Sequence, residues 1–128
     1  MQKRINISSG TLWEDKVGYC RAVRIGNIIE VSGTTSVDRD SLIGKDDLYS
    51  QTKFIILKIE KALQDAGSEL TDVVRTRIYV TDISKWEEAA KAHAEFFGTI
   101  KPATTLVEVS SLIDPDMLIE IEASAVIQ

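Results

Sequence analysis

The sequence predicts an α+β fold, in which a mixed sheet carries two helices on one of its faces. Three observations predict it: strand-like segments recur along the chain, two segments place apolar residues at helical spacing, and strand–helix–strand units follow a hairpin. Only two prolines occur, and no repeat or Ser/Gly-rich linker divides the 128 residues. We expect one domain over residues 1–128 in the order β-β-α-β-α-β-β, with room for an extended segment before it.

The first two strands form a predicted hairpin. Residues 17–25 alternate loosely between apolar and polar side chains, which is typical of a strand. Gly26 and Asn27 follow as a two-residue turn, since both tolerate the positive φ that such turns need. Residues 28–33 form the partner strand, and residues 34–45 are expected to be a loop.

A long helix is predicted over residues 46–66. Asp46 and Asp47 favour its start through capping and the helix dipole. Gly67 favours its end, because glycine adopts the left-handed conformation at little cost. The apolar stripe that would face the sheet consists of Leu48, Ile55, Ile56, Ile59, Ala62, Leu63 and Ala66.

The second half of the chain contains three more predicted strands and one helix. Residues 73–81 are β-branched and aromatic, and residues 103–109 and 117–127 also have strand patterns. Residues 84–87 match a capping box and predict a helix that ends near Gly98. Its buried positions are expected to be Trp86, Ala89, Ala90, Phe97 and either His93 or Ala94.

Right-handed crossovers would place both helices on the same face and leave the other face of the sheet uncovered. We expect that face to carry Val23, Val31 and Val107 or their neighbours. A sheet face that is neither fully polar nor covered usually meets another subunit, so the pattern predicts self-association.

The last strand alternates plainly, with Ile119, Ile121, Ala123, Ala125 and Ile127 on one face and Glu120, Glu122, Ser124 and Val126 on the other.

Charge and composition exclude several classes of protein. Lys and Arg total 15 against 20 Asp and Glu, which gives a net charge of −5 and argues against a nucleic-acid or anionic-membrane binder. One His and the single Cys20 cannot supply a Cys/His zinc set or an intrachain disulfide. The N-terminus has no signal-peptide pattern, and the longest apolar run, residues 54–57, cannot span a bilayer. These features predict a soluble cytoplasmic protein without a metal.

Pairs of charged residues on one strand face are the first candidates for chemistry. Glu120 and Glu122 share a face. Either one of these carboxylates orients water or transfers a proton, or both simply belong to a solvated surface. Arg75 and Arg77 likewise form either a carboxylate clamp or an exposed charged face. Arg21 and Arg24 lie on opposite strand faces, so at most one of them faces a given pocket.

Three further residues have both a functional and a structural interpretation. Gly33, at a strand end, either admits a ligand close to the backbone or belongs to an ordinary turn. Nothing near Cys20 in the sequence activates its thiol, which favours a buried strand cysteine. His93 has no patterned partner, which favours a packing or surface role.

Taken together, these segments resemble the reactive intermediate deaminase family, also called RidA or YjgF. The resemblance spans residues 17 to 126, and it depends on the order and spacing of several short motifs. These motifs are residues 18–27 (GYCRAVRIGN), 31–33 (VSG), 75–82 (RTRIYVTD), 96–97 (FF), 102–103 (PA), 107–109 (VEV) and 119–123 (IEIEA).

The resemblance implies a chorismate-mutase-like subunit that assembles as a homotrimer, with sheets packed inward and helices facing out. It implies three clefts between subunits that accept small carboxylate or keto-acid ligands. In archetypal members these clefts hydrolyse reactive enamines and imines to keto acids and ammonia, without a metal or organic cofactor.

The family's site residues match this sequence in part. Its aromatic residue near the first strand matches Tyr19, its Ser-Gly matches Ser32 and Gly33, and its water-positioning carboxylate matches Glu120. Its signature arginine falls at Thr104. Its cysteine falls at Leu106 and its second-helix asparagine at Ala90, and Thr105 lies between Thr104 and Leu106.

Losing that arginine removes a bidentate, charge-assisted contact to a substrate carboxylate. Either Arg21, Arg24 or Arg77 supplies a substitute cation, or the ligand is not a simple carboxylate. The first hypothesis is therefore a Rid-type enzyme in which Glu120 polarises water, with ligand contacts from Tyr19, Ser32, Gly33, Thr104, Thr105 and Leu106.

A second hypothesis is a non-catalytic metabolite-binding or chaperone-like trimer, which the missing arginine favours. A third is an endoribonuclease, which the acidic balance and the lack of a His/Lys/Arg cluster disfavour.

Overall fold

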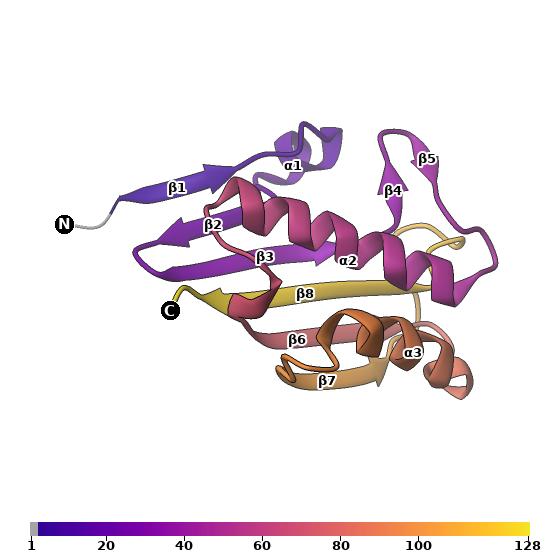
Figure 1. The fold of residues 1–128 in the computed structure, drawn as a ribbon. Helices are drawn as coiled ribbons and strands as arrows, with labels where there is room; N and C mark the ends of the chain where they lie inside the picture. The colour runs from indigo at the N-terminus through magenta and orange to yellow at the C-terminus, as the bar shows by residue number, and fades with distance from the viewer. Residues whose placement is uncertain (1–2) are drawn as a thin grey trace.

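The computed structural model describes residues 3–128, and it contains one mixed six-stranded sheet (Figure 1). Met1 and Gln2, which belong to the expected domain 1–128 and to the N-terminus without a signal-peptide pattern, lie outside the described residues. All neighbouring strands are antiparallel except the last pair, which is parallel. In sheet order the strands are β1 (Arg4–Ile7), β2 (Ala22–Ile25), β3 (Ile28–Thr34), β8 (Ile119–Val126), β6 (Val73–Val80) and β7 (Ala103–Glu108).

Two helices cover one face of this sheet, which confirms the predicted α+β fold. Helix α2 (Leu48–Asp65) crosses β3 and β8, and α3 (Trp86–Phe97) lies over β6 and β7 (Figure 1). The predicted stripe of α2 is buried, and it meets the apolar face of β8. No helix among residues 3–128 is long and apolar enough to cross a bilayer.

The ends of α2 follow the predicted signals closely. The Asp47 side chain accepts a hydrogen bond from the Ser50 amide at 3.0 Å, so Asp47 is the N-cap and the helix begins at Leu48 rather than at residue 46. Gly67 has φ of 84°, the left-handed conformation expected just after a helix.

The predicted strand over residues 17–25 is wrong in its first half. Leu12–Val17 forms a short helix, α1, and Gly18 ends it at φ of 88°, so β2 begins only at Ala22. The predicted N-terminal extended segment is β1. The predicted loop 34–45 contains a small hairpin of β4 (Val37–Asp38) and β5 (Ser41–Leu42).

The start of α3 also differs from the prediction. The Asp82 side chain, and not Ser84, accepts the capping hydrogen bond, and it begins a short 3-10 turn over Ile83–Lys85. Trp86 then becomes the first helical residue and is 49% exposed, so its predicted burial is wrong. Ala89, Ala92 and Phe97 are the buried residues of this helix; Ala90 and His93 are half-buried and Ala94 is exposed.

The uncovered face of the sheet is more polar than predicted. Val23 and Val107 lie on it, paired with Glu30 and Tyr79. Val31 does not, because it is 3% exposed and packs in the core beneath the helices.

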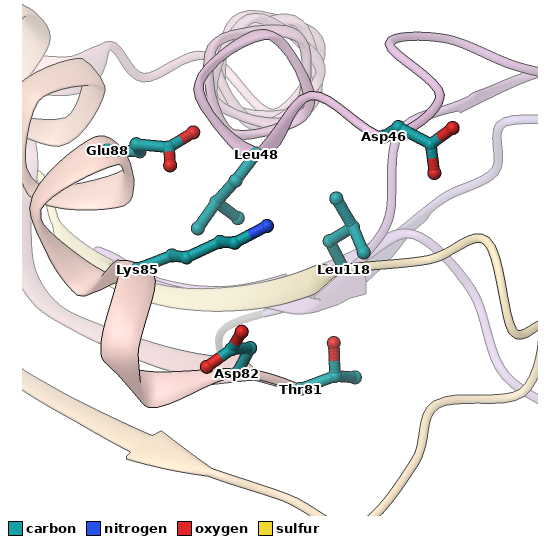
Figure 2. Close-up of a pocket in the computed structure, with 7 residues that line it drawn as sticks. All are labelled: Asp46, Leu48, Thr81, Asp82, Lys85, Glu88 and Leu118. Carbon is teal, nitrogen blue, oxygen red and sulfur yellow. The ribbon is translucent and has the colours of Figure 1, made fainter.

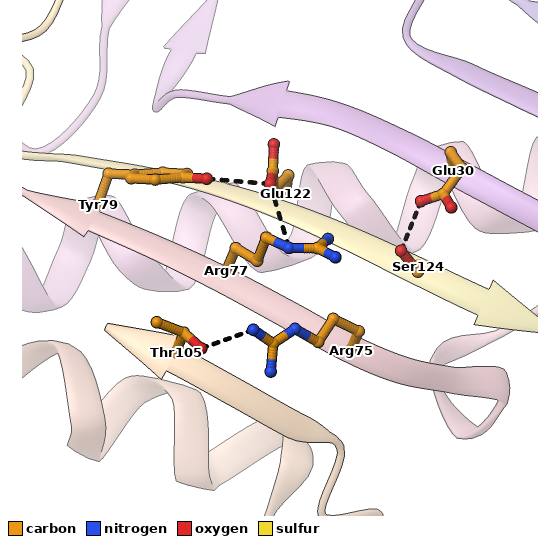
Figure 3. Close-up of polar contacts among 7 residues, drawn as sticks. All are labelled: Glu30, Arg75, Arg77, Tyr79, Thr105, Glu122 and Ser124. Carbon is orange, nitrogen blue, oxygen red and sulfur yellow. Dashed lines mark hydrogen bonds and ion pairs between the residues drawn. The ribbon is translucent and has the colours of Figure 1, made fainter. Parts of the chain in front are cut away.

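Charged side chains run across this uncovered face from strand to strand (Figure 3). Arg77 Nε lies 3.6 Å from Glu122 Oε1, and the Tyr79 hydroxyl donates to the same oxygen at 3.0 Å. Two further cross-strand bonds join Arg75 to Thr105 and Ser124 to Glu30.

Candidate functional site

Glu120 lies on the uncovered face of β8, beside an irregular part of β3. The β3–β8 register shifts between Val31 and Thr34, which brings Gly33 against the Glu120 side chain. A Cβ at Gly33 would overlap the Glu120 carboxylate and lie 3.0 Å from its Cδ. The absence of a side chain at Gly33 therefore makes room for Glu120, an alternative that the sequence did not suggest.

Arg21 is the cation whose charge acts on the Glu120 carboxylate. It is 7% exposed, its Nη2 donates to the Gly33 carbonyl at 2.7 Å, and its guanidinium lies 5.6 Å from the centre of the Tyr19 ring. Burial raises the pKa of Glu120 above the ordinary 4.5, the nearby Arg21 charge acts to lower it, and Glu122 to raise it. We call Tyr19, Arg21, Ser32, Gly33 and Glu120 the Glu120 cluster.

Ser32 holds the segment that carries Tyr19 and Arg21 against β3. Its hydroxyl donates to the Cys20 carbonyl at 2.7 Å, and its amide donates to the Arg21 carbonyl at 3.0 Å. Tyr19, Cys20 and Ser32 line an open depression of about 440 Å³ that extends toward β1 and α1. Within one chain the depression therefore reaches the Glu120 cluster at Tyr19 and Ser32, and Arg21, Gly33 and Glu120 do not line it.

The structure places Thr104 away from the Glu120 cluster within one chain. Thr104 pairs with Thr76 on β6, whereas Glu120 pairs with Tyr79 farther along that strand and on the opposite face. The Thr104 hydroxyl lies 2.7 Å from Thr76 Oγ1, which in turn lies 2.9 Å from His93 Nε2. We call Thr76, His93 and Thr104 the Thr104 cluster.

Neighbours of Thr104 on β7 alternate between the two faces. Leu106 packs against the core under α3, while Thr105 lies on the uncovered face and accepts from Arg75 Nη2 at 2.6 Å. His93 has the packing role expected of it, since its ring contacts Phe97 at 4.6 Å between centroids and burial lowers its pKa.

Two of the three candidate substitute cations have other partners. Arg24 donates to the Ala66 carbonyl at 2.6 Å and to the Gly26 carbonyl at 2.8 Å, so it caps the carboxyl end of α2. Arg77 is occupied by Glu122 on the open face. Arg21 is therefore the candidate that lies beside Glu120.

Two charged residues that are withdrawn from solvent were missed in the sequence analysis: Glu14, which is buried, and Lys58, which is half-buried. Glu14 is 4% exposed and accepts hydrogen bonds from Ser8, Ser9 and Thr11; burial acts to raise its pKa, but these bonds outweigh it and lower the value. Lys58, on α2, reaches beneath the β4–β5 hairpin and donates to two backbone carbonyls, of Thr35 and Val37. A run of hydroxyl residues before Glu14 and a lysine beside the apolar stripe of α2 were the available signals.

A separate pocket of about 120 Å³ lies between α2, α3 and the ends of β6 and β8 (Figure 2). Lys85 extends toward Leu48 and Leu118 there, with Asp82 and Glu88 nearby. None of the sequence-predicted site residues lines it. Among residues 3–128, no three His, Cys, Asp or Glu side chains are grouped so that they could hold a metal ion.

Comparison with known proteins connects this geometry to a family. The family model described as endoribonuclease L-PSP matches residues 14–127. A RutC family protein from Pyrococcus abyssi is 40% identical over 108 residues, which is 84% of each chain. A protein named 3-aminoacrylate deaminase RutC, from Acinetobacter baylyi, is 32% identical over 98% of each chain.

Solved structures agree with these matches. A crystal structure of a Mycobacterium tuberculosis member of the YjgF/YER057c/UK114 family has a TM-score of 0.90 and 50% identity, covering 98% of this chain and 100% of that one. The YjgF product of E. coli has a TM-score of 0.78 and 29% identity, covering 86% and 88%.

Proposed function

Since the chain belongs to the RidA/YjgF family, whose model is described as endoribonuclease L-PSP, we propose that it hydrolyses small enamines and imines at the Glu120 cluster to carbonyl compounds and ammonia. The observation that carries this proposal is a half-buried carboxylate seated against the Gly33 backbone, beside the buried Arg21. The similarity to a protein named 3-aminoacrylate deaminase supports the same reaction class.

The proposed reaction needs one water molecule and one group that transfers protons. An enamine first takes a proton from solvent on carbon and becomes an iminium ion. Water then adds to the C=N carbon while the Glu120 carboxylate accepts a proton from it, so that a C–O bond forms. Glu120 returns that proton to nitrogen. The C–N bond then breaks, ammonia leaves, and the hydroxyl gives its proton to the Glu120 carboxylate as the C=O forms. A carboxyl group whose pKa is raised by burial suits both directions of transfer.

We further propose that the site is completed by a second copy of this chain. Thr104 and Thr105 are exposed on the edge strand β7, and three apolar residues of α1, Leu12, Trp13 and Val17, are exposed as well. Contact between copies would cover these surfaces and bring the Thr104 cluster of one chain to the Glu120 cluster of its neighbour. The family resemblance favours three copies.

Glu120→Gln is expected to lower kcat about hundredfold, because the amide cannot accept a proton from water. Ammonia release from freshly generated 2-aminoacrylate measures this. Glu122→Gln is the matched control, since it makes the same change two residues away on the same face. Its rate should stay within about threefold of the wild-type rate.

The pH dependence gives the same experiment a second readout. As the pH falls through the pKa of Glu120, the carboxylate is protonated and the rate should decline, with a midpoint above 4.5 because burial raises that pKa. Glu120→Gln should lack this decline. Equal losses in the two variants, or no ammonia release by the wild type, would contradict the proposed activity.

A second candidate function is metabolite binding without turnover. Thr104 stands where the family has its arginine, and its hydroxyl is already bonded to Thr76. Thermal stabilisation by a small ligand without ammonia release would favour this alternative. An endoribonuclease remains disfavoured by the net charge of −5.

A further inference from the structure

In the described part of the chain, two cations lie near the end of β3 without forming an ion pair. Arg21 is 7% exposed, forms one side-chain hydrogen bond, to the Gly33 carbonyl, and its buried Nε has no partner. Lys58 is half-buried and bonds only to the Thr35 and Val37 carbonyls, at 3.0 and 2.8 Å. Within residues 3–128, neither cation has a carboxylate oxygen closer than 4.0 Å.

This arrangement is energetically unusual. Buried charges are ordinarily paired, and a buried N–H without an acceptor is costly. Burial and then repulsion by Arg21 lower the pKa of Lys58 to about 8, so the two positive charges act on each other through the protein. Asp38 and Glu14 act to raise the pKa of Lys58, and Arg21 acts to lower that of Glu120, but none of these acids lies within ion-pair distance of either cation.

We propose that Arg21 binds the carboxylate of the substrate at the Glu120 cluster, with Lys58 adding to the positive potential. This inference rests on the proposed function and assigns a residue of this chain to hold the substrate carboxylate. Arg21 thereby supplies the positive charge that Thr104 lacks, and it does so from the Glu120 side of the site.

The position of the guanidinium suits this task. On one side it lies near the Tyr19 ring, which lines the open depression. On the other side it contacts the carbonyl of Gly33, the residue against which the Glu120 side chain packs. A carboxylate beside Tyr19 would accept from the N–H groups that Gly33 leaves free, since guanidinium has five N–H donors. The reactive carbon, one or two bonds away, would then face Glu120.

A purely structural role is the competing explanation. Arg21 joins β2 to the end of β3, and Lys58 holds the β4–β5 hairpin, so both residues have local partners. One neutral donor is enough to satisfy the Gly33 carbonyl, however, and a structural role gives no reason for charge. Arg21→Gln separates the two roles, because its amide keeps a donor and loses the charge.

Calorimetric titration with pyruvate, the keto-acid product of 2-aminoacrylate hydrolysis, tests the proposal. Arg21→Gln should raise the Kd for pyruvate at least tenfold, while Arg77→Gln, the matched control, should stay within about twofold. Methyl pyruvate, which lacks the charge, should bind weakly and equally to both variants and to the wild type. Arg21→Lys keeps the charge without the planar fork and should fall between wild type and Arg21→Gln.

The outcomes separate this proposal from the proposed function. Unchanged pyruvate affinity in Arg21→Gln, or no pyruvate binding by the wild type at about 10 mM, would overturn the role of Arg21 even if ammonia is released. A wild type that binds pyruvate through Arg21 but releases no ammonia would overturn the activity alone. If Arg21→Gln does not fold, the Arg21→Lys variant decides. Weaker pyruvate binding by Arg21→Lys, together with an unchanged affinity for methyl pyruvate, supports the proposal. An unchanged affinity of Arg21→Lys for pyruvate refutes it.

Discussion

Gly33→Ala is expected to lower kcat/KM about a thousandfold while leaving the fold intact. The added methyl group overlaps the Glu120 carboxylate, so that side chain must move away from the reacting carbon. The same change disturbs the carbonyl to which Arg21 is anchored, which adds a loss of binding to a loss of catalysis. Gly33 has no positive φ, so the substitution changes space and not backbone preference.

A double variant provides the control for this prediction. Glu120→Asp shortens the side chain by one methylene, and in the Gly33→Ala background it should recover part of the lost rate. Steady-state ammonia release from 2-aminoacrylate measures all three variants, with thermal melting as the check on folding. A fully active Gly33→Ala protein would show that the close approach of Gly33 and Glu120 has no functional role.

Gln51→Leu is expected to lower the free energy of unfolding by about 3 kcal/mol. Gln51 is completely buried on α2, and its side chain joins three backbone groups: it donates to the Gly44 and Asp116 carbonyls and accepts from the Leu118 amide, at 2.9 to 3.1 Å. Leucine fills the space but leaves all three groups without a partner in the interior. Because Leu118 directly precedes β8, the same substitution also loosens the start of the strand that carries Glu120.

Urea unfolding of wild type and variant measures this loss. Gln64→Leu, an exposed glutamine in the last turn of the same helix, is the matched control and should change the stability by less than about 0.5 kcal/mol. A loss of under about 1 kcal/mol in Gln51→Leu would mean that water replaces the three bonds.

Strong local patterns account for what the sequence predicted of the fold. The stripe of α2, its cap at Asp47 and the alternation of β8 are each set within one segment, so they could be recognised without tertiary information. Helix α1 could not, because it is short and its apolar residues Leu12 and Val17 face solvent in one chain. Trp86 was misplaced because the Asp82 turn shifted the helix start.

Glu120 and Gly33 were candidates from their strand positions, and the family resemblance assigned them roles, but their mutual contact depends on a register shift that no local pattern reveals. Within one chain Thr104 faces His93 and not Glu120, because strand pairing across β6 decides which face each side chain takes. The family resemblance places the meeting of Thr104 and Glu120 between subunits, which stays a prediction. The choice of Arg21 over Arg24 and Arg77 likewise needed the tertiary partners of all three arginines.

Mixed assemblies of two inactive variants test most directly whether neighbouring chains share the site. Glu120→Gln inactivates the half of the site that one chain supplies, and Thr104→Trp inactivates the half that its neighbour supplies. Each variant alone should therefore be inactive. In a closed ring co-expressed at equal amounts, about a quarter of the contacts would join an intact Glu120 to an intact Thr104, and about a quarter of the wild-type rate should return. A mixed preparation that forms such assemblies and stays as inactive as its two parents would contradict the shared site.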